Sequence, residues 1–108
     1  TRFPLGQARF EIPTLEEEIQ LVQGLNASTG KKTGIYPEIK SPAWHREQGQ
    51  DISKAVIAVL QKYGYRTKND PCYLQCFDFK ETRRIREELG WQGLLIQLIT
   101  ENADKESD

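Results

Sequence analysis

Apolar residues recur at the spacing of an amphipathic helix in the first third of the chain. Thr14 and Glu17 form a capping box, and the apolar positions that follow, at intervals of four, three and three residues, are Leu15, Ile19, Val22 and Leu25. This pattern predicts a helix that begins at Leu15 and ends between Gly24 and Ser28.

Two further helices are predicted. The strongest periodic signal follows Asp51, a suitable N-cap, and its apolar positions at i, i+3, i+4, i+7, i+8 and i+11 are Ile52, Ala55, Val56, Val59, Leu60 and Tyr63. Gly64 supplies a left-handed stop. Asp78 and Glu81 cap the third helix, which ends at Gly90 and whose apolar face is Phe79, Ile85 and Leu89.

Three short segments, 34–40, 72–77 and 94–99, are typical of β-strands, and a polar loop is expected at 41–50. The resulting order, α-β-α-β-α-β with apolar strands, favours an α/β fold with a parallel sheet covered by helices. A doubly wound sheet and a partial (β/α)8 TIM-type barrel both satisfy this order. Three strands cannot close a barrel, so in the second case the chain is less than half of one.

Polar residues inside the strands bear on this choice. Glu38, Lys40, Gln75 and Gln97 each interrupt an otherwise apolar run. Burying such a group without a partner costs about 1 to 3 kcal/mol. In a barrel, inward-facing polar residues near the carboxyl ends of successive strands converge on one active site. The barrel therefore gives all four residues a common destination.

Glu38 and Lys40 are the candidate site residues with the clearest geometry. Residues i and i+2 of a strand share a face, so both should point to the same side as Tyr36. A carboxylate and an ammonium group on one face could hold a metal ion and an anion together. The alternative is a solvated pair on an exposed edge strand. Gln75 has two equal readings, a substrate contact or a partner for backbone groups.

Composition limits the functions that the residues can serve. The chain has 108 residues, the size of one small domain, and its net charge of −1 gives no electrostatic argument for nucleic acid or an anionic membrane. No apolar run reaches the roughly 18 residues of a membrane span. The absence of methionine suggests a piece of a longer protein. We therefore expect residues 1–108 to be a single segment with a polar tail at about 101–108.

The remaining reactive or charged residues have simpler interpretations. Cys72 and Cys76 are expected to be buried thiols, too far apart along a strand for a disulfide and too few for a zinc site. Trp44 and His45 are expected in a solvent-exposed loop, with a contact at the rim of the site as the alternative. The pair Arg83 and Arg84 is expected to be solvated.

Several motifs together resemble one enzyme family. They are the segments 22–26 (Val-Gln-Gly-Leu-Asn), 29–31 (Thr-Gly-Lys), 34–40 (Gly-Ile-Tyr-Pro-Glu-Ile-Lys), 62–65 (Lys-Tyr-Gly-Tyr) and 73–78 (Tyr-Leu-Gln-Cys-Phe-Asp). They resemble the middle of bacterial periplasmic glycerophosphodiester phosphodiesterases, over roughly residues 1 to 100. A single motif such as Glu-Ile-Lys would be weak alone, but the set is dense.

The resemblance implies a TIM-type barrel that hydrolyses glycerophosphodiesters to an alcohol and glycerol 3-phosphate in the periplasm. It implies a divalent cation, usually calcium with magnesium as the alternative, with Glu38 as a metal ligand. It also implies that Lys40 lies at the phosphate, and Gln75 is the other candidate contact to this small-molecule substrate. The oligomeric state is left open.

The sequence departs from the family pattern in its acid and base residues. The family carries a His-Arg-Gly element and a second histidine upstream, and neither is present here. His45 cannot replace two histidines, so no catalytic residue is assigned and the isolated chain is predicted to be inactive. The alternative function is a small, non-catalytic α/β binding or interaction module.

Overall fold

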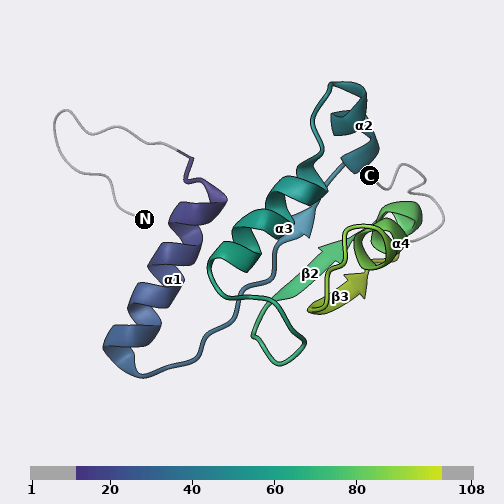
Figure 1. The fold of residues 1–108 in the computed structure, drawn as a ribbon. Coiled ribbons are helices and arrows are strands. Elements are labelled where there is room, and N and C mark those ends of the chain that lie inside the picture. The colour runs from purple at the N-terminus through teal and green to yellow at the C-terminus, as the bar shows by residue number, and fades with distance from the viewer. Residues whose placement is uncertain (1–11, 101–108) are drawn as a thin grey trace, which may run out of the picture.

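The computed structural model describes residues 12–100, and this part of the chain alternates helices with parallel strands (Figure 1). The predicted polar tail lies outside the described residues. The elements are α1 (Leu15–Thr29), β1 (Glu38–Ile39), α2 (Pro42–Glu47), α3 (Ile52–Lys62), β2 (Tyr73–Cys76), α4 (Phe79–Glu87) and β3 (Leu94–Gln97). The predicted order is confirmed, with α2 as an addition in the segment that was expected to be a loop.

The three strands form one parallel sheet in the order β1-β2-β3. β1 is shorter than the predicted strand, although Ile35 still bonds to the segment that leads into β2. The N–H of Ile35 donates to Pro71 O at 2.9 Å, and the backbone oxygen of Ile35 accepts from Tyr73 N at 2.9 Å. The physical reason is Pro37, which accepts from Gln75 N at 3.0 Å but has no N–H to donate. The ladder is therefore interrupted in the middle of the predicted strand.

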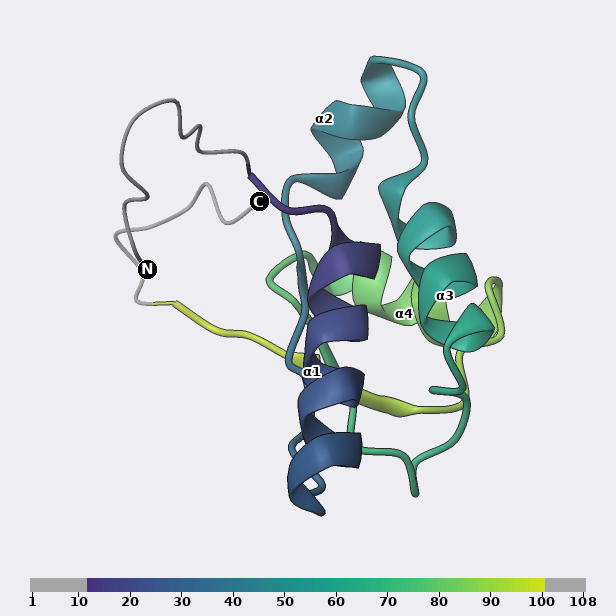
Figure 2. The ribbon, with the colours of Figure 1, turned by 90° about the vertical axis from the view of Figure 1, so that its left-hand side faces the viewer.

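The hydrophobic core lies between one face of the sheet and the helices. Its fully buried members come from every layer and include Ile19, Ile39, Leu60, Leu74, Ile85 and Trp91. α3 contacts β1 and α1, while α4 contacts β2 and β3. Figures 1 and 2 show α1, α3 and α4 gathered against the same side of the strands. The helices therefore cover one face and leave the other uncovered within residues 12–100.

The predicted helix starts are confirmed by hydrogen bonds. Thr14 and Glu17 form the full capping box of α1, Asp51 accepts from the N–H of Lys54, and Asp78 accepts from the N–H of Glu81. The predicted end of the first helix was too early, because α1 continues through Gly24 to a left-handed cap at residue 30. The face assigned to the third helix was wrong at Phe79, which is exposed at the start of α4.

α2 replaces most of the predicted loop at 41–50. Pro42 stands at its first position, where a missing N–H costs nothing, and the proline is buried. With six residues the helix is too short to show an apolar period, so the sequence pattern could not reveal it. Figures 1 and 2 show α2 beyond the carboxyl end of β1. None of the helices in residues 12–100 has the length and hydropathy needed to cross a bilayer.

Candidate functional site

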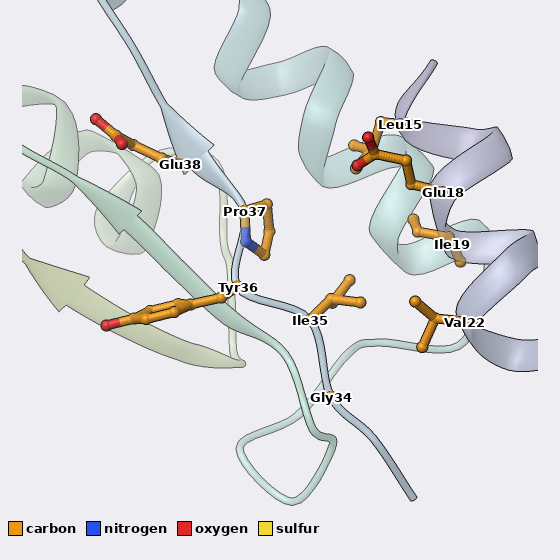
Figure 3. A pocket seen from close by; sticks show the side chains of 9 residues that line it. All are labelled: Leu15, Glu18, Ile19, Val22, Gly34, Ile35, Tyr36, Pro37 and Glu38. Carbon is orange, nitrogen blue, oxygen red and sulfur yellow. The ribbon is translucent and has the colours of Figure 1, made fainter. Parts of the chain in front are cut away.

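The side chains around β1 alternate as the strand pattern predicts. Tyr36, Glu38 and Lys40 are exposed, whereas Ile35 and Pro37 are half-buried and Ile39 is fully buried. In Figure 3, Ile35 points toward Ile19 and Val22 of α1, while Tyr36 and Glu38 point away from that helix. The candidate carboxylate therefore lies on the face of the sheet that the helices leave uncovered.

The register of the sheet brings Gln75 to the same face. Glu38 pairs with Gln75 across β1 and β2, and Gln75 pairs with Ile96 of β3. Residues that pair across parallel strands point to the same side and lie about 5 Å apart. The prediction that Glu38 and Gln75 share a destination is therefore confirmed at the level of the face they occupy.

Two tyrosines lie near this pair on the uncovered face. The rings of Tyr36 and Tyr73 meet edge to face, with their centroids 5.7 Å apart, yet they remain 56% and 44% exposed. Together with Ile96 they line a shallow hollow of about 400 Å³. A self-sufficient module would leave these apolar surfaces in water, whereas the interior of a barrel would cover them. The exposure of these rings therefore favours the interior of a barrel over a self-sufficient module.

A second hollow lies between Gly34–Glu38 and α1, beside the edge of β1 that pairs with no other strand within residues 12–100. It has a volume of about 490 Å³ and is lined on the helix side by Leu15, Glu18, Ile19 and Val22 (Figure 3). Parallel strands in a closed barrel have a neighbour on both sides, so this free edge is where a further strand would pair. The hollow agrees with an open, partial barrel.

The carboxylate of Glu38 makes no hydrogen bond or ion pair with any residue in 12–100. Gln75 is used in part, since its Nε2 donates to the backbone oxygen of Tyr36 at 2.9 Å. This bond matches the backbone-satisfying alternative for Gln75, and it leaves the amide oxygen without a donor among the described residues. The carboxylate of Glu38 is a hard donor of the kind that calcium and magnesium prefer.

Glu38 cannot form a metal site by itself. Within residues 12–100 no cluster of three or more His, Cys, Asp or Glu side chains could hold a metal ion. Calcium takes six to eight oxygen ligands. Glu38 therefore fits such a cation only as one ligand among several.

Lys40 follows β1 directly and is exposed at the carboxyl end of the strand. The next residue, Ser41, has φ 51° and ψ 52°, a left-handed conformation that is uncommon outside glycine. Such backbone strain is kept when the surrounding structure holds it and is frequent at functional sites. The chain thus turns sharply between Lys40 and α2.

His45 has a structural contact rather than a free ring. Its Nδ1 lies 2.8 Å from the backbone oxygen of Ser41, and because a carbonyl only accepts, Nδ1 carries the proton. Its ring also meets Trp44 edge to face at 5.0 Å. Both residues belong to α2, so the loop assignment was wrong, although Trp44 is exposed as expected. The bond of His45 supports the strained Ser41 turn.

Gln97 does not join the other polar strand residues, which corrects the prediction of a common destination for all four. It pairs with Cys76, whose side chain is buried, and therefore faces the helices. Its Oε1 accepts from Thr82 of α4 at 2.5 Å and its Nε2 donates to the backbone oxygen of Phe77 at 2.9 Å. Gln97 thus ties β3 to α4 and to the end of β2.

The cysteine prediction is confirmed. Cys72 and Cys76 are both buried, and no disulfide joins them. Burial, with the nearby carboxylate of Asp70 as a lesser cause, raises the pKa of the Cys72 thiol to about 12. A thiol with such a pKa remains protonated at neutral pH and is a poor nucleophile or metal ligand.

Sequence reasoning missed a polar network behind α2. Arg84 was expected to be solvated, but it pairs with Asp51 and with Glu81, whose side chain is only 1% exposed. Arg46 of α2 reaches the same carboxylate. The only signal in the sequence was a glutamate in the first turn of a helix, which its capping role already explained.

Parallel strands, helices on one face and polar residues at the carboxyl ends of the other face define an α/β protein of the barrel class. The chain belongs to the glycerophosphoryl diester phosphodiesterase family, which it matches over residues 1–108. The family fold is a TIM barrel, so the three strands are part of a (β/α)8 barrel and not of a doubly wound sheet.

Two curated relatives agree with this membership. The chain is 51% identical over 110 residues to a glycerophosphodiester phosphodiesterase of Haemophilus influenzae, an alignment that covers 98% of the chain and 30% of that protein. It is 49% identical over 88 residues to a glycerophosphodiester phosphodiesterase of Treponema pallidum, covering 82% of the chain and 25% of that protein. The chain therefore spans about 30% or less of the length of these relatives.

Proposed function

We propose that this chain is a segment of a glycerophosphodiester phosphodiesterase that hydrolyses glycerophosphodiesters to an alcohol and glycerol 3-phosphate. The observation that carries the proposal is the family match over the whole chain, combined with Glu38 and Gln75 side by side on the uncovered face. The aromatic surface of that face argues against the alternative of a small autonomous binding module.

Glu38 is assigned as one ligand of a divalent cation, calcium in the first instance and magnesium as the alternative. Three features support the assignment: its position at the carboxyl end of the sheet, its exposure, and the absence of a partner within residues 12–100. When bound, such a cation neutralises charge on the phosphoryl oxygens. The remaining ligands have to come from other parts of the barrel, because the described residues hold no acidic cluster.

Lys40 is assigned to the phosphate, which an ammonium group binds as a point charge. Lys40 lies two residues beyond Glu38 and is exposed, whereas Ile39 between them is buried. This alternation indicates that Lys40 points to the same side as Glu38. Gln75 is assigned to the substrate through its amide oxygen, which can accept from a hydroxyl group of the glycerol moiety. Its Nε2 stays with the backbone oxygen of Tyr36 and holds the amide in place.

Proton transfer is assigned to residues outside this segment. His45 is engaged with Ser41 and cannot serve both the attacking and the leaving oxygen. We therefore expect the isolated 108-residue chain to have no phosphodiesterase activity. A periplasmic location is part of the proposal and rests on the resemblance of the sequence motifs. Cell fractionation followed by detection of the full-length enzyme tests the location.

The metal assignment is tested in the full-length enzyme, meaning this segment joined to the rest of its barrel. Glu38→Gln removes the negative charge and keeps the shape, so it should lower hydrolysis by about 100-fold or more. Calcium affinity, measured by isothermal titration, should weaken in parallel. Glu47→Gln is the matched control, since Glu47 is exposed on α2 and has no assigned role. Unchanged calcium affinity in Glu38→Gln would contradict the assignment.

A further inference from the structure

α2, the helix that follows Lys40, has little local support. It contains six residues, and isolated helices of that length do not form in water. Its N-cap, Ser41, makes no side-chain capping bond and holds the left-handed conformation described above. The position of α2 therefore depends on contacts with other elements.

Arg46, near the end of α2, makes the main polar contact of this kind. Its Nη1 lies 2.6 Å from Oε1 of Glu81, which is 35 residues further along the chain in α4. The side chain of Arg46 is 40% exposed, whereas that of Glu81 is buried. Because one partner is removed from water, the pair is less screened than an ordinary surface ion pair.

Glu81 is itself held by one other element, α3, and by a residue of its own helix, α4. Its second carboxylate oxygen, Oε2, accepts from the hydroxyl group of Ser53 in α3 and from Nη1 of Arg84 at 2.8 Å. Arg84 in turn pairs with Asp51, the N-cap of α3. Both oxygens of Glu81 are satisfied, so the carboxylate is a rigid anchor that presents Oε1 to α2.

We propose that Arg46 and Glu81 are positioning residues that fix the direction in which the chain leaves β1 and thereby aim Lys40 at the substrate phosphate. The inference rests on the proposed function, since it assigns the ion pair a role at the same site. Ser41 alone separates Lys40 from α2, so a shift of the helix reaches Lys40 through one strained residue. A misplacement of about 1 Å can cost on the order of 100-fold in rate.

The test compares three variants of the full-length enzyme. Arg46→Met keeps the aliphatic stem and removes the ion pair, and should lower kcat/KM by about 10- to 100-fold. Arg46→Lys keeps the charge and should recover most of that loss. Arg83→Met is the matched control, because Arg83 pairs with Glu87 on the solvent side of α4, where both side chains are largely exposed. It should leave kcat/KM unchanged.

Two further measurements separate positioning from general destabilisation. In Arg46→Met, amide hydrogen exchange should become faster in residues 40–50 and stay unchanged in α1, and calcium affinity should also stay unchanged. Faster exchange without a fall in kcat/KM would show a structural tie only and overturn the inference. Unchanged exchange in 40–50 would overturn it as well, because the ion pair would then not hold α2.

Failure of the proposed function has a different signature. If the unaltered full-length enzyme hydrolyses no glycerophosphodiester, the proposed function fails, and the positioning role fails with it. If the unaltered enzyme is active but Glu38→Gln keeps its calcium affinity, only the metal assignment fails. The comparison of Arg46→Met with Arg46→Lys still decides the positioning role in that case.

Discussion

The two faces of the sheet differ in how their polar groups are satisfied. On the helix-covered face, Gln97 bonds to Thr82 and to backbone oxygens. On the uncovered face, Glu38 has no partner among residues 12–100, and only one end of the Gln75 amide is bonded. Both faces carry polar residues inside strands, but only one face satisfies them within the described chain.

This difference separates polar residues that stabilise the fold from those that serve a site. A half-buried amide such as that of Gln97, with its hydrogen bonds made, contributes to the packing of strand against helix. A carboxylate that the fold leaves unpaired at the carboxyl end of a parallel strand is available for a ligand. Gln97 and Gln75 are the same residue type in neighbouring strands, yet both ends of the Gln97 amide are bonded and only one end of the Gln75 amide is bonded within residues 12–100.

The largest effect on stability should separate two adjacent residues of β2, Leu74 and Gln75, which lie on opposite faces of the sheet. Leu74→Ala empties a fully buried position and should lower the free energy of unfolding by about 2 to 5 kcal/mol. Gln75→Ala loses one hydrogen bond and should cost about 1 kcal/mol. Urea unfolding of the full-length enzyme, followed by circular dichroism, measures both. Equal losses would show that the faces do not differ in the complete barrel.

Lys40→Met tests, through the activity of the full-length enzyme, whether the uncovered face binds the substrate phosphate. Loss of a charge-assisted hydrogen bond to phosphate, worth about 1.5 to 3 kcal/mol, should lower kcat/KM by roughly 10- to 100-fold. Calcium affinity should stay close to that of the unaltered enzyme, since Glu38 is untouched. Lys54→Met, an exposed change on α3, serves as the control and should have no effect. If both variants behave alike, Lys40 does not contact the substrate.

The smallest effect concerns the polar network on the helix side. The Arg84 guanidinium lowers the pKa of Asp51, so the carboxylate stabilises the folded state when it is ionised. Asp51→Asn keeps an N-cap but loses the ion pair, and should cost about 1 kcal/mol at pH 7.

The sign of the pH dependence follows from the lowered pKa of Asp51. The contribution is fully present above the unfolded pKa of about 3.9 and is lost as the pH falls through the lower folded value. Urea titrations at a series of pH values should therefore show that the free energies of unfolding of the unaltered protein and of Asp51→Asn become equal at acid pH. Glu87→Gln, which removes only the exposed pair with Arg83, should show no such difference. If Asp51→Asn were less stable than the unaltered protein by the same amount at every pH, the loss would not come from the charge of Asp51.

Local chemistry explains why much of the fold could be predicted. The caps at Thr14, Asp51 and Asp78 depend on hydrogen bonds between residues three apart, and the helix periods depend on spacings of three and four. The face occupied by Glu38 follows from strand alternation in the same way. These features need no knowledge of distant partners.

The sequence by itself determined the alternation of helix and strand, the caps, and the shared side of Tyr36, Glu38 and Lys40. Only the tertiary structure decided that Gln97 faces the helices, that α2 exists, and that Arg46 and Arg84 meet on Glu81. Each of these depends on strand register or on contacts between residues far apart in the chain. Such contacts form only when the sheet and its helices pack, so no local pattern of residues records them.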